Sequence, residues 1–280
     1  MPSTGSDKVH VDLTGPPQTM LDMVYARLLD ADSPQPVLGD PWAKTVMDQV
    51  DYDVSKSPIA KQRRRQTMGI AVRGAQLDIW TRQFLASHHR PVVLQIGAGL
   101  DSRVFRVDPG REVDWYDIDF ANVIALRERF YPKRDNYHLV ASSATDLSWL
   151  EAIPADRPAL FLAEGVSMYL TESEGVGLLR RVVERFPAGE LQLDFWSRFG
   201  SKAMRKSNAV VRWSNSEVSW SVDEPDDILS AVPGTRLIRA IPIFEAETTQ
   251  RLSKGYRRFA AAAARTPVLR KIVQLHRYAF

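Results

Sequence analysis

The sequence of 280 residues contains no cysteine. Disulfide bonds, thiolate nucleophiles, and zinc or iron–sulfur sites with cysteine ligands are therefore excluded within this chain. Histidine is scarce as well, with five residues, and no two of them have the spacing that brings metal ligands to one face of a helix. We therefore expect no metal site, and we look for chemistry that carboxylates, arginines and aromatic residues can support.

Long apolar runs are also missing. The run FAAAAA at 259–264 is far too short to span a bilayer, and the first fifteen residues lack the apolar core of a signal peptide. Neither charge dominates, because 37 basic residues stand against 34 acidic ones and give a net charge of +3. We therefore expect a cytoplasmic protein with no membrane or nucleic-acid partner. The sequence leaves the oligomeric state open.

Residues 1–90 predict an N-terminal arm followed by helices that cover the site. The first helix follows Pro17 and has an apolar face made of Met20, Leu21, Val24 and Leu28. The second begins with Asp40 as cap and Pro41 in its first turn. A third, at 57–88, is expected to be long, with a break at Gly69.

Residues 91–280 predict an α/β core. Apolar strand-like runs alternate with helical patterns, of which the clearest begins with a capping box of Thr171 and Glu174 and has Val176, Leu179, Val183 and Phe186 on its inner face. Such alternation indicates a mostly parallel sheet covered on both faces, with its ligand outside the carboxyl ends of the strands. The expected strands are 91–97, 112–119, 137–142, 159–165, 190–196, 235–244 and 274–280.

The stretch VVLQIGAGLDSRVFR at 92–106 ends the first strand in a glycine turn followed by an acid and two arginines. Gly97 and Gly99 fit two positions of the dinucleotide motif G-x-G-x-x-G, but Ser102 replaces the third glycine. Asp119 follows the next strand, where a carboxylate can accept hydrogen bonds from both ribose hydroxyls of a nucleoside cofactor. Its alternative role is a cap for the following helix.

A further acid, Asp146, follows the third strand, where the adenine of such a cofactor would lie. Its carboxylate can accept from the adenine amino group while Leu147 offers a backbone N–H, an arrangement expected for S-adenosylmethionine. Capping of a short helix is the alternative for Asp146. A nicotinamide-dependent oxidoreductase would use the same glycine turn, but Ser102 and the ATDL loop disfavour it. A nucleoside-binding protein without turnover is a further alternative.

These motifs resemble the leucine carboxyl methyltransferase family, and in particular its bacterial members that act in polyketide synthesis. The resemblance covers most of the chain and rests on the glycine turn, WYDIDFANVIALRERF, ATDL and AEGVSMYL. It implies the Rossmann-like fold of class I S-adenosylmethionine-dependent methyltransferases, with a seven-stranded, mostly parallel sheet. Extra N-terminal helices and a lid inserted after the fifth strand, at about 197–233, are implied within one compact domain.

The resemblance also implies cofactor contacts. Glu164 would hold the methionine ammonium, and Arg73 would hold a carboxylate of the cofactor or of the substrate; a solvated arginine is the alternative for Arg73. Phe120 and Ala121 depart from the family's usual residues after the acid. The full set of expected cofactor contacts is Arg73, Gly97, Gly99, Asp101, Asp119, Asp146, Leu147 and Glu164.

The stretch after the fifth strand combines tryptophans with basic residues. Trp196, Trp213 and Trp220 are expected to bind a flat acidic molecule. The same composition would suit a nucleic-acid methyltransferase, or the rings could form a small core of the lid itself. The basic, amphipathic stretch 254–274 predicts a covering helix with a solvated face.

We expect the partner to be a small acidic organic substrate, methylated on a carboxylate. No histidine is placed at the carboxyl edge of the predicted sheet to act as a base; the alternative is that His10 of the N-terminal arm, or an acid, folds over the site. A carboxylic acid, with a pKa of about 4, is ionised at neutral pH and needs none, whereas a phenol with a pKa of about 10 would benefit from one. Arg73 and Tyr169 are the expected catalytic residues. Tyr169 would donate a hydrogen bond to a substrate oxygen, and packing against the following helix is its alternative role. A phenolic hydroxyl of a secondary metabolite is the alternative acceptor.

Overall fold

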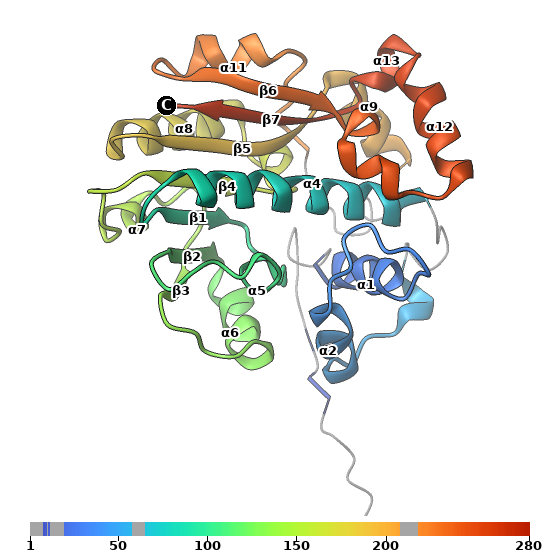
Figure 1. Ribbon diagram of the computed structural model, residues 1–280, viewed down its shortest axis with the longest axis horizontal. Coiled ribbons are helices and arrows are strands. Elements are labelled where there is room, and N and C mark those ends of the chain that lie inside the picture. Colours follow the sequence, from blue (N-terminus) through green and yellow to red (C-terminus); the bar gives the residue numbers. More distant parts are fainter. Residues whose placement is uncertain (1–7, 10, 12–19, 58–64, 208–217) are drawn as a thin grey trace, which may run out of the picture.

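The chain forms one seven-stranded sheet, with strands in the order β3-β2-β1-β4-β5-β7-β6 (Figure 1). The computed structural model describes residues 8, 9, 11, 20–57, 65–207 and 218–280. Five strands run parallel, and β7 is antiparallel to both of its neighbours. The predicted mostly parallel α/β sheet is therefore confirmed. The strands are β1 (Val92–Ile96), β2 (Asp114–Asp119), β3 (Tyr137–Ala141), β4 (Ala159–Ala163), β5 (Gly189–Trp196), β6 (Arg236–Pro242) and β7 (Val273–Ala279).

Burial on both faces explains the unbroken apolar runs of the central strands. Every residue of β1 and β4 is buried. Leu160 and Leu162 of β4 pack toward α4 (Arg65–Ser87), which lies across one face (Figure 1). Phe161 packs in the opposite layer, against α7 (Ser148–Glu151), α8 (Glu172–Arg185) and α11 (Pro225–Ala231). The strand order reverses between β1 and β4: β2 and β3 are added on one side of β1, and β4 and β5 on the other. Folds of this kind bind ligands at that point of the sheet.

The N-terminal helices α1 (Met20–Ala31) and α2 (Trp42–Gln49) pack together, and α1 also packs on α4. Met20, Leu21 and Val24 are buried as predicted, and Leu28 is half-buried. The predicted break at Gly69 is wrong, because α4 continues through it. A glycine costs a helix about 1 kcal/mol relative to alanine, and tertiary packing outweighs such a preference. The expected arm lies almost wholly outside the described residues.

The capping box of α8 is confirmed, since the Thr171 hydroxyl accepts from the Glu174 N–H and the Thr171 N–H donates to the Glu174 carboxylate. The predicted inner face is confirmed. Leu179 and Phe186 are buried, and Val176 and Val183 are partly buried and pack against the same core. Trp220 packs on Gly175 at the start of α8. The most deeply buried residues within the helix are Gly175, Leu178, Leu179 and Val182.

Two glycines of α8 should respond to alanine with opposite signs. A β-carbon on Gly175 would lie 2.0 Å from Cζ3 of Trp220, whereas nothing lies within 4 Å of one on Gly177. Gly175→Ala should lower the free energy of unfolding by about 1–3 kcal/mol, because the ring has to move. Gly177→Ala should raise it by about 0.5–1 kcal/mol through helix propensity. Urea unfolding of both variants checks this, and stabilisation by both would mean that Trp220 is not held against α8.

The C-terminal part supplies further cover. The segment 197–233, expected to form a lid, contains α9 (Arg198–Ser207) and α11. The short helices η4 (Ile243–Glu245) and η5 (Glu247–Arg251) lead to α12 (Lys254–Ala264) and α13 (Pro267–Arg270). The predicted covering helix at 254–274 is therefore confirmed over α12 but wrong as one continuous helix, because the helix breaks before Pro267 and the chain enters β7 at Val273. Two further short helices are η2 (Val54–Lys56) and η3 (Ser167–Tyr169). No helix in the described part of the chain is long and apolar enough to cross a membrane.

Candidate functional site

A cavity of about 650 Å³ lies at the carboxyl ends of the parallel strands. Its wall includes the residues that follow four of them, at 97–101, 118–120, 142–145 and 164–166. Helices α1, α4, α9 and α12 and the short helices η3 and η4 also contribute to the wall. The volume is within the range of sites that bind small organic ligands. The structure thus brings Gly97, Gly99, Asp101, Asp119 and Glu164 together as predicted from their places after the strands.

The glycine turn has a shape that other residues would not tolerate. Gly97 and Gly99 have φ of +59° and +52°, in the left-handed region. A β-carbon on Gly97 would also lie 2.5 Å from Cγ2 of Val166. The turn therefore exposes bare backbone to the cavity, and a ligand can approach it closely.

Asp119 fixes this turn. One carboxylate oxygen accepts from the N–H of Gly99 at 2.7 Å, and the other from the N–H of Phe120 at 2.7 Å. Burial raises the pKa of Asp119, while these two N–H groups act against the rise. The alternative role as a helix cap does not hold, because α6 (Ala121–Phe130) begins after Phe120 without a side-chain cap. Each oxygen retains a lone pair for a ligand hydroxyl.

The residues after β3 are arranged differently from the prediction. The exposed carboxylate of Asp146 accepts from the N–H of Ser148 at 3.1 Å, and the hydrogen bonds with Ser148 lower its pKa. Leu147 precedes α7 as its first flanking residue. Neither residue is part of the described cavity wall, which here consists of 142–145. Binding of the adenine end by Asp146 and Leu147 stays a prediction.

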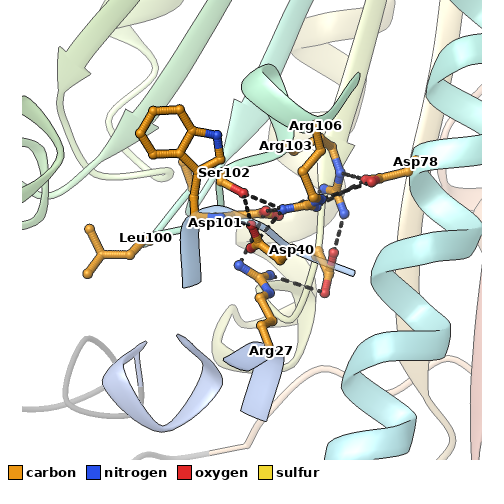
Figure 2. A network of polar contacts seen from close by, with 12 residues as sticks. Arg27, Asp40, Asp78, Leu100, Asp101, Ser102, Arg103 and Arg106 are labelled. Carbon is orange, nitrogen blue, oxygen red and sulfur yellow. Dashed lines mark hydrogen bonds and ion pairs between the residues drawn. The ribbon is translucent and has the colours of Figure 1, made fainter. Parts of the chain in front are cut away.

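A buried ion-pair network underlies the polar end of the cavity (Figure 2). Glu164, which follows β4, is paired with Arg73 at 3.1 Å, with Arg27 at 3.7 Å and with Arg103. Burial alone would raise the pKa of Glu164, but the three guanidinium groups outweigh it and lower the pKa. Asp101 lies between Arg27 and Arg106, at 3.2 and 2.6 Å, and its pKa is lowered well below the ordinary value despite burial, chiefly by Arg103 and Arg106.

Arg73 bridges two acids rather than facing solvent. Its Nη1 lies 2.9 Å from Asp194 of β5, and its Nε lies 3.1 Å from Glu164. Its side chain is 13% exposed, so the alternative of a solvated arginine does not hold. The N–H of Gly165 donates to the second oxygen of Asp194 at 2.6 Å. The two residues expected to bind opposite charges of the cofactor are therefore paired with each other.

Sequence reasoning missed the outer half of the network. Asp78 of α4 pairs with Arg103 at 2.6 Å and with Arg106 at 3.0 Å. Asp40 accepts from the Ser102 hydroxyl at 2.5 Å and pairs with Arg106 at 3.2 Å. Ser102, which breaks the dinucleotide motif, therefore ties the glycine turn to the start of α2. Arg103 and Arg106, which follow the glycine turn in the sequence, were the one indication that acids such as Asp78 would be needed as their partners.

Most of the remaining cavity wall is apolar or aromatic, although Ser142, Ser143, Thr145, Glu174 and Thr249 also line it. Tyr169 and Trp196 lie in it as predicted, and α12 adds Tyr256 and Phe259, which the sequence did not indicate. The substrate-binding role of Trp220 is wrong, because this ring is 4% exposed, packs edge-on against Phe195 and is not part of the described wall. Trp220 therefore belongs to the hydrophobic core and not to the cavity wall. Trp213 lies outside the described residues.

Histidines contribute nothing to the described cavity wall. His276 is buried in β7, where burial lowers its pKa to about 3 and keeps the ring neutral. His10 lies outside the described residues. Within the part of the chain that the structure describes, no group of acids and histidines is arranged to hold a metal ion.

Similar proteins match most of the chain. The tetracenomycin polyketide synthesis O-methyltransferase TcmP of Streptomyces glaucescens is 39% identical over 230 residues, which cover 81% of this chain and 82% of that protein. The S-adenosyl-L-methionine-dependent methyltransferase dpfgK of Gibberella zeae is 32% identical over 247 residues, covering 82% and 83%.

Solved structures share the fold. A structure described as a methyltransferase, from Thermobifida fusca, has a TM-score of 0.59 at 15% identity and covers 92% of this chain and 96% of its own. The plantazolicin methyltransferase BamL, in complex with a triazolic desmethylPZN analog and SAH, has a TM-score of 0.51 at 12% identity and covers 93% of this chain and 97% of its own. The sequence profile of leucine carboxyl methyltransferases matches residues 20–183. The chain belongs to the leucine carboxyl methyltransferase family.

Proposed function

We propose that this protein transfers a methyl group to a carboxylate oxygen of a small aromatic molecule of the polyketide type and releases a methyl ester. The protein is an S-adenosylmethionine-dependent methyltransferase, as its family and its named relatives are. The acceptor carboxylate and its aromatic body are the proposal. The observation that carries it is the division of the cavity into a polar end of paired charges and an apolar end without a histidine among its described residues.

The polar end fits the methyl donor. Bare backbone at Gly97 and Gly99 would face its amino-acid part, and Asp119 would accept from its ribose hydroxyls. Glu164 would take its ammonium and Arg73 its carboxylate. Because Arg73 and Glu164 are paired 3.1 Å apart, each would exchange its partner for the opposite charge of the ligand. Every buried charge would then stay compensated, which keeps the exchange inexpensive.

The bound donor supplies a methyl carbon that is already electrophilic. The residues of the chain have to align the acceptor oxygen with it and exclude water, and orientation alone can lower the barrier by about 7–11 kcal/mol. Arg27 and Arg73 are the only cations in the described cavity wall, and both are paired with acids. An acceptor carboxylate would therefore keep a free lone pair for attack, since no guanidinium fork holds both of its oxygens. Tyr169 would donate to the second oxygen.

A matched pair of acceptors tests the chemistry. The enzyme is incubated with methyl-labelled S-adenosylmethionine and either 2-naphthoic acid or 2-naphthol, and the product is treated with mild base. We expect labelled product from the acid and release of the label as methanol, because an ester hydrolyses and an aryl ether does not. Label retained from 2-naphthol, with a rate that rises toward a pKa of about 10, would assign the enzyme to phenolic acceptors instead.

The Asp119→Asn variant tests the proposed ribose contact. Asparagine keeps one acceptor oxygen but loses the charge and the second acceptor, so either the hold on Gly99 or the ligand contact is weakened. We expect S-adenosylhomocysteine to bind about 1–2 kcal/mol more weakly by calorimetry. Asp48→Asn is the comparison, because Asp48 of α2 is an exposed acid outside the described wall. Unchanged affinity in Asp119→Asn would remove the ribose role.

A further inference from the structure

Five of the seven methionines of the chain line the cavity, although its wall is a small minority of the residues. They come from α1, α4, η3 and α9, so no single element accounts for their convergence. The five are Met20, Met23, Met68, Met168 and Met204.

The methionines occupy both ends of the cavity. A β-carbon on Gly99 would lie 3.5 Å from Cγ of Met20, so this side chain packs on the glycine turn at the donor end. Met168 and Met204 pack together in a small cluster with Tyr169 and Trp196, the ring residues of the apolar end. Met68 enters the same cavity from the first turns of α4.

Methionine side chains differ physically from the leucine or isoleucine that could fill the same wall. They are unbranched, have a polarizable sulfur and make favourable contacts with aromatic rings. Surfaces rich in methionine can repack around partners of different shape. Flat rings from Trp196, Phe244 and Phe259 supply stiff walls beside these adaptable side chains.

We infer that the acceptor end takes planar aromatic acids of different ring number, and that Met68, Met168 and Met204 reshape it around each one. This inference rests on the proposed function for the identity of the reaction. These three side chains would let the enzyme bind acceptors of different size.

Calorimetry with three acids tests the inference, in the presence of S-adenosylhomocysteine. The probes are 2-naphthoic, anthracene-2-carboxylic and pyrene-1-carboxylic acid. We expect the wild-type Kd values to lie within about 10-fold of one another. In the Met68→Leu/Met168→Leu/Met204→Leu variant we expect one acid to be retained and the others to weaken by about 10-fold or more, the effect of a misfit of one or two methylene groups.

Met47→Leu is the matched control, because Met47 is buried on α2 and is not part of the described cavity wall. It should leave all three Kd values unchanged. The triple variant should still bind S-adenosylhomocysteine, since leucine nearly conserves the volume of methionine. An unchanged affinity profile in the triple variant, or a wild type that binds one acid or none of the three, overturns the inference. Binding of all three without ester formation would contradict the proposed acceptor chemistry and leave the inference intact.

Discussion

Replacing Glu164 with alanine should lower the free energy of unfolding by about 3–5 kcal/mol, the usual cost of removing one partner from a buried ion-pair network. Its carboxylate is 5% exposed and is paired with Arg27, Arg73 and Arg103. Without it, three guanidinium groups at the end of β4 would lose a shared counter-charge in a site that water barely reaches. Thermal or urea unfolding measures the loss.

A surface acid provides the comparison. Glu151 is also paired with two arginines, Arg181 and Arg185, but its side chain is 52% exposed. Glu151→Ala should therefore cost at most about 1 kcal/mol, because water and salt screen exposed pairs. Glu164→Gln should fall between the two variants, since the amide keeps one acceptor oxygen. Equal effects at positions 151 and 164 would mean that the network is not insulated from solvent.

The pH dependence of this effect has a defined sign. The arginines lower the pKa of Glu164 below its ordinary value of 4.5. The stabilisation by its ionised form is therefore fully present above pH 4.5 and is lost as the pH falls through the lowered folded pKa. The difference in stability between the wild type and Glu164→Gln should shrink in the same acid range. A difference that grows on acidification would contradict the assigned direction.

The local sequence patterns were sufficient to predict the sheet and α8. Buried strands are continuous apolar runs, and the capping box of Thr171 and Glu174 lies within four residues, so both are readable without knowledge of tertiary contacts. The break predicted at Gly69 is wrong because only the low helix propensity of glycine predicts it. Packing of α4 along the sheet outweighs the weak preference of one residue.

The site was predictable only where it follows the strands. Ligands of parallel sheets lie at the carboxyl ends of the strands, and this rule alone predicts that Gly97, Asp119 and Glu164 share one site. The three residues do line one cavity. Arg73 and Asp194 form an ion pair although they lie far apart in the chain. The sequence around either residue does not indicate its partner. The same holds for Trp220, whose ring turns inward because Gly175 leaves room for it.

Arg73→Lys should reduce kcat/KM for methyl transfer by about 10–100-fold. Arg73 uses two edges of its guanidinium group, Nε toward Glu164 and Nη1 toward Asp194. Lysine keeps the charge but cannot form this fork, so the group that orients the carboxylate of the donor or of the acceptor would be displaced. Arg82→Lys on the same helix is the control: it is exposed, bonds only to the Arg106 carbonyl among the contacts described, and should leave the rate unchanged.

The split between kinetic constants distinguishes the two roles of Arg73. If it holds the carboxylate of the donor, Arg73→Lys should weaken S-adenosylhomocysteine binding and raise the KM for S-adenosylmethionine. If it orients the acceptor, kcat should fall while S-adenosylhomocysteine binds normally, because the lost interaction then matters only as the methyl group moves. The acceptor loses its charge in that step, so a fork that gripped both of its oxygens would oppose the reaction. We therefore expect the first result, with Arg73 on the donor and the acceptor carboxylate left free to attack. A wild-type kcat in Arg73→Lys, together with a wild-type KM for S-adenosylmethionine, would exclude both roles.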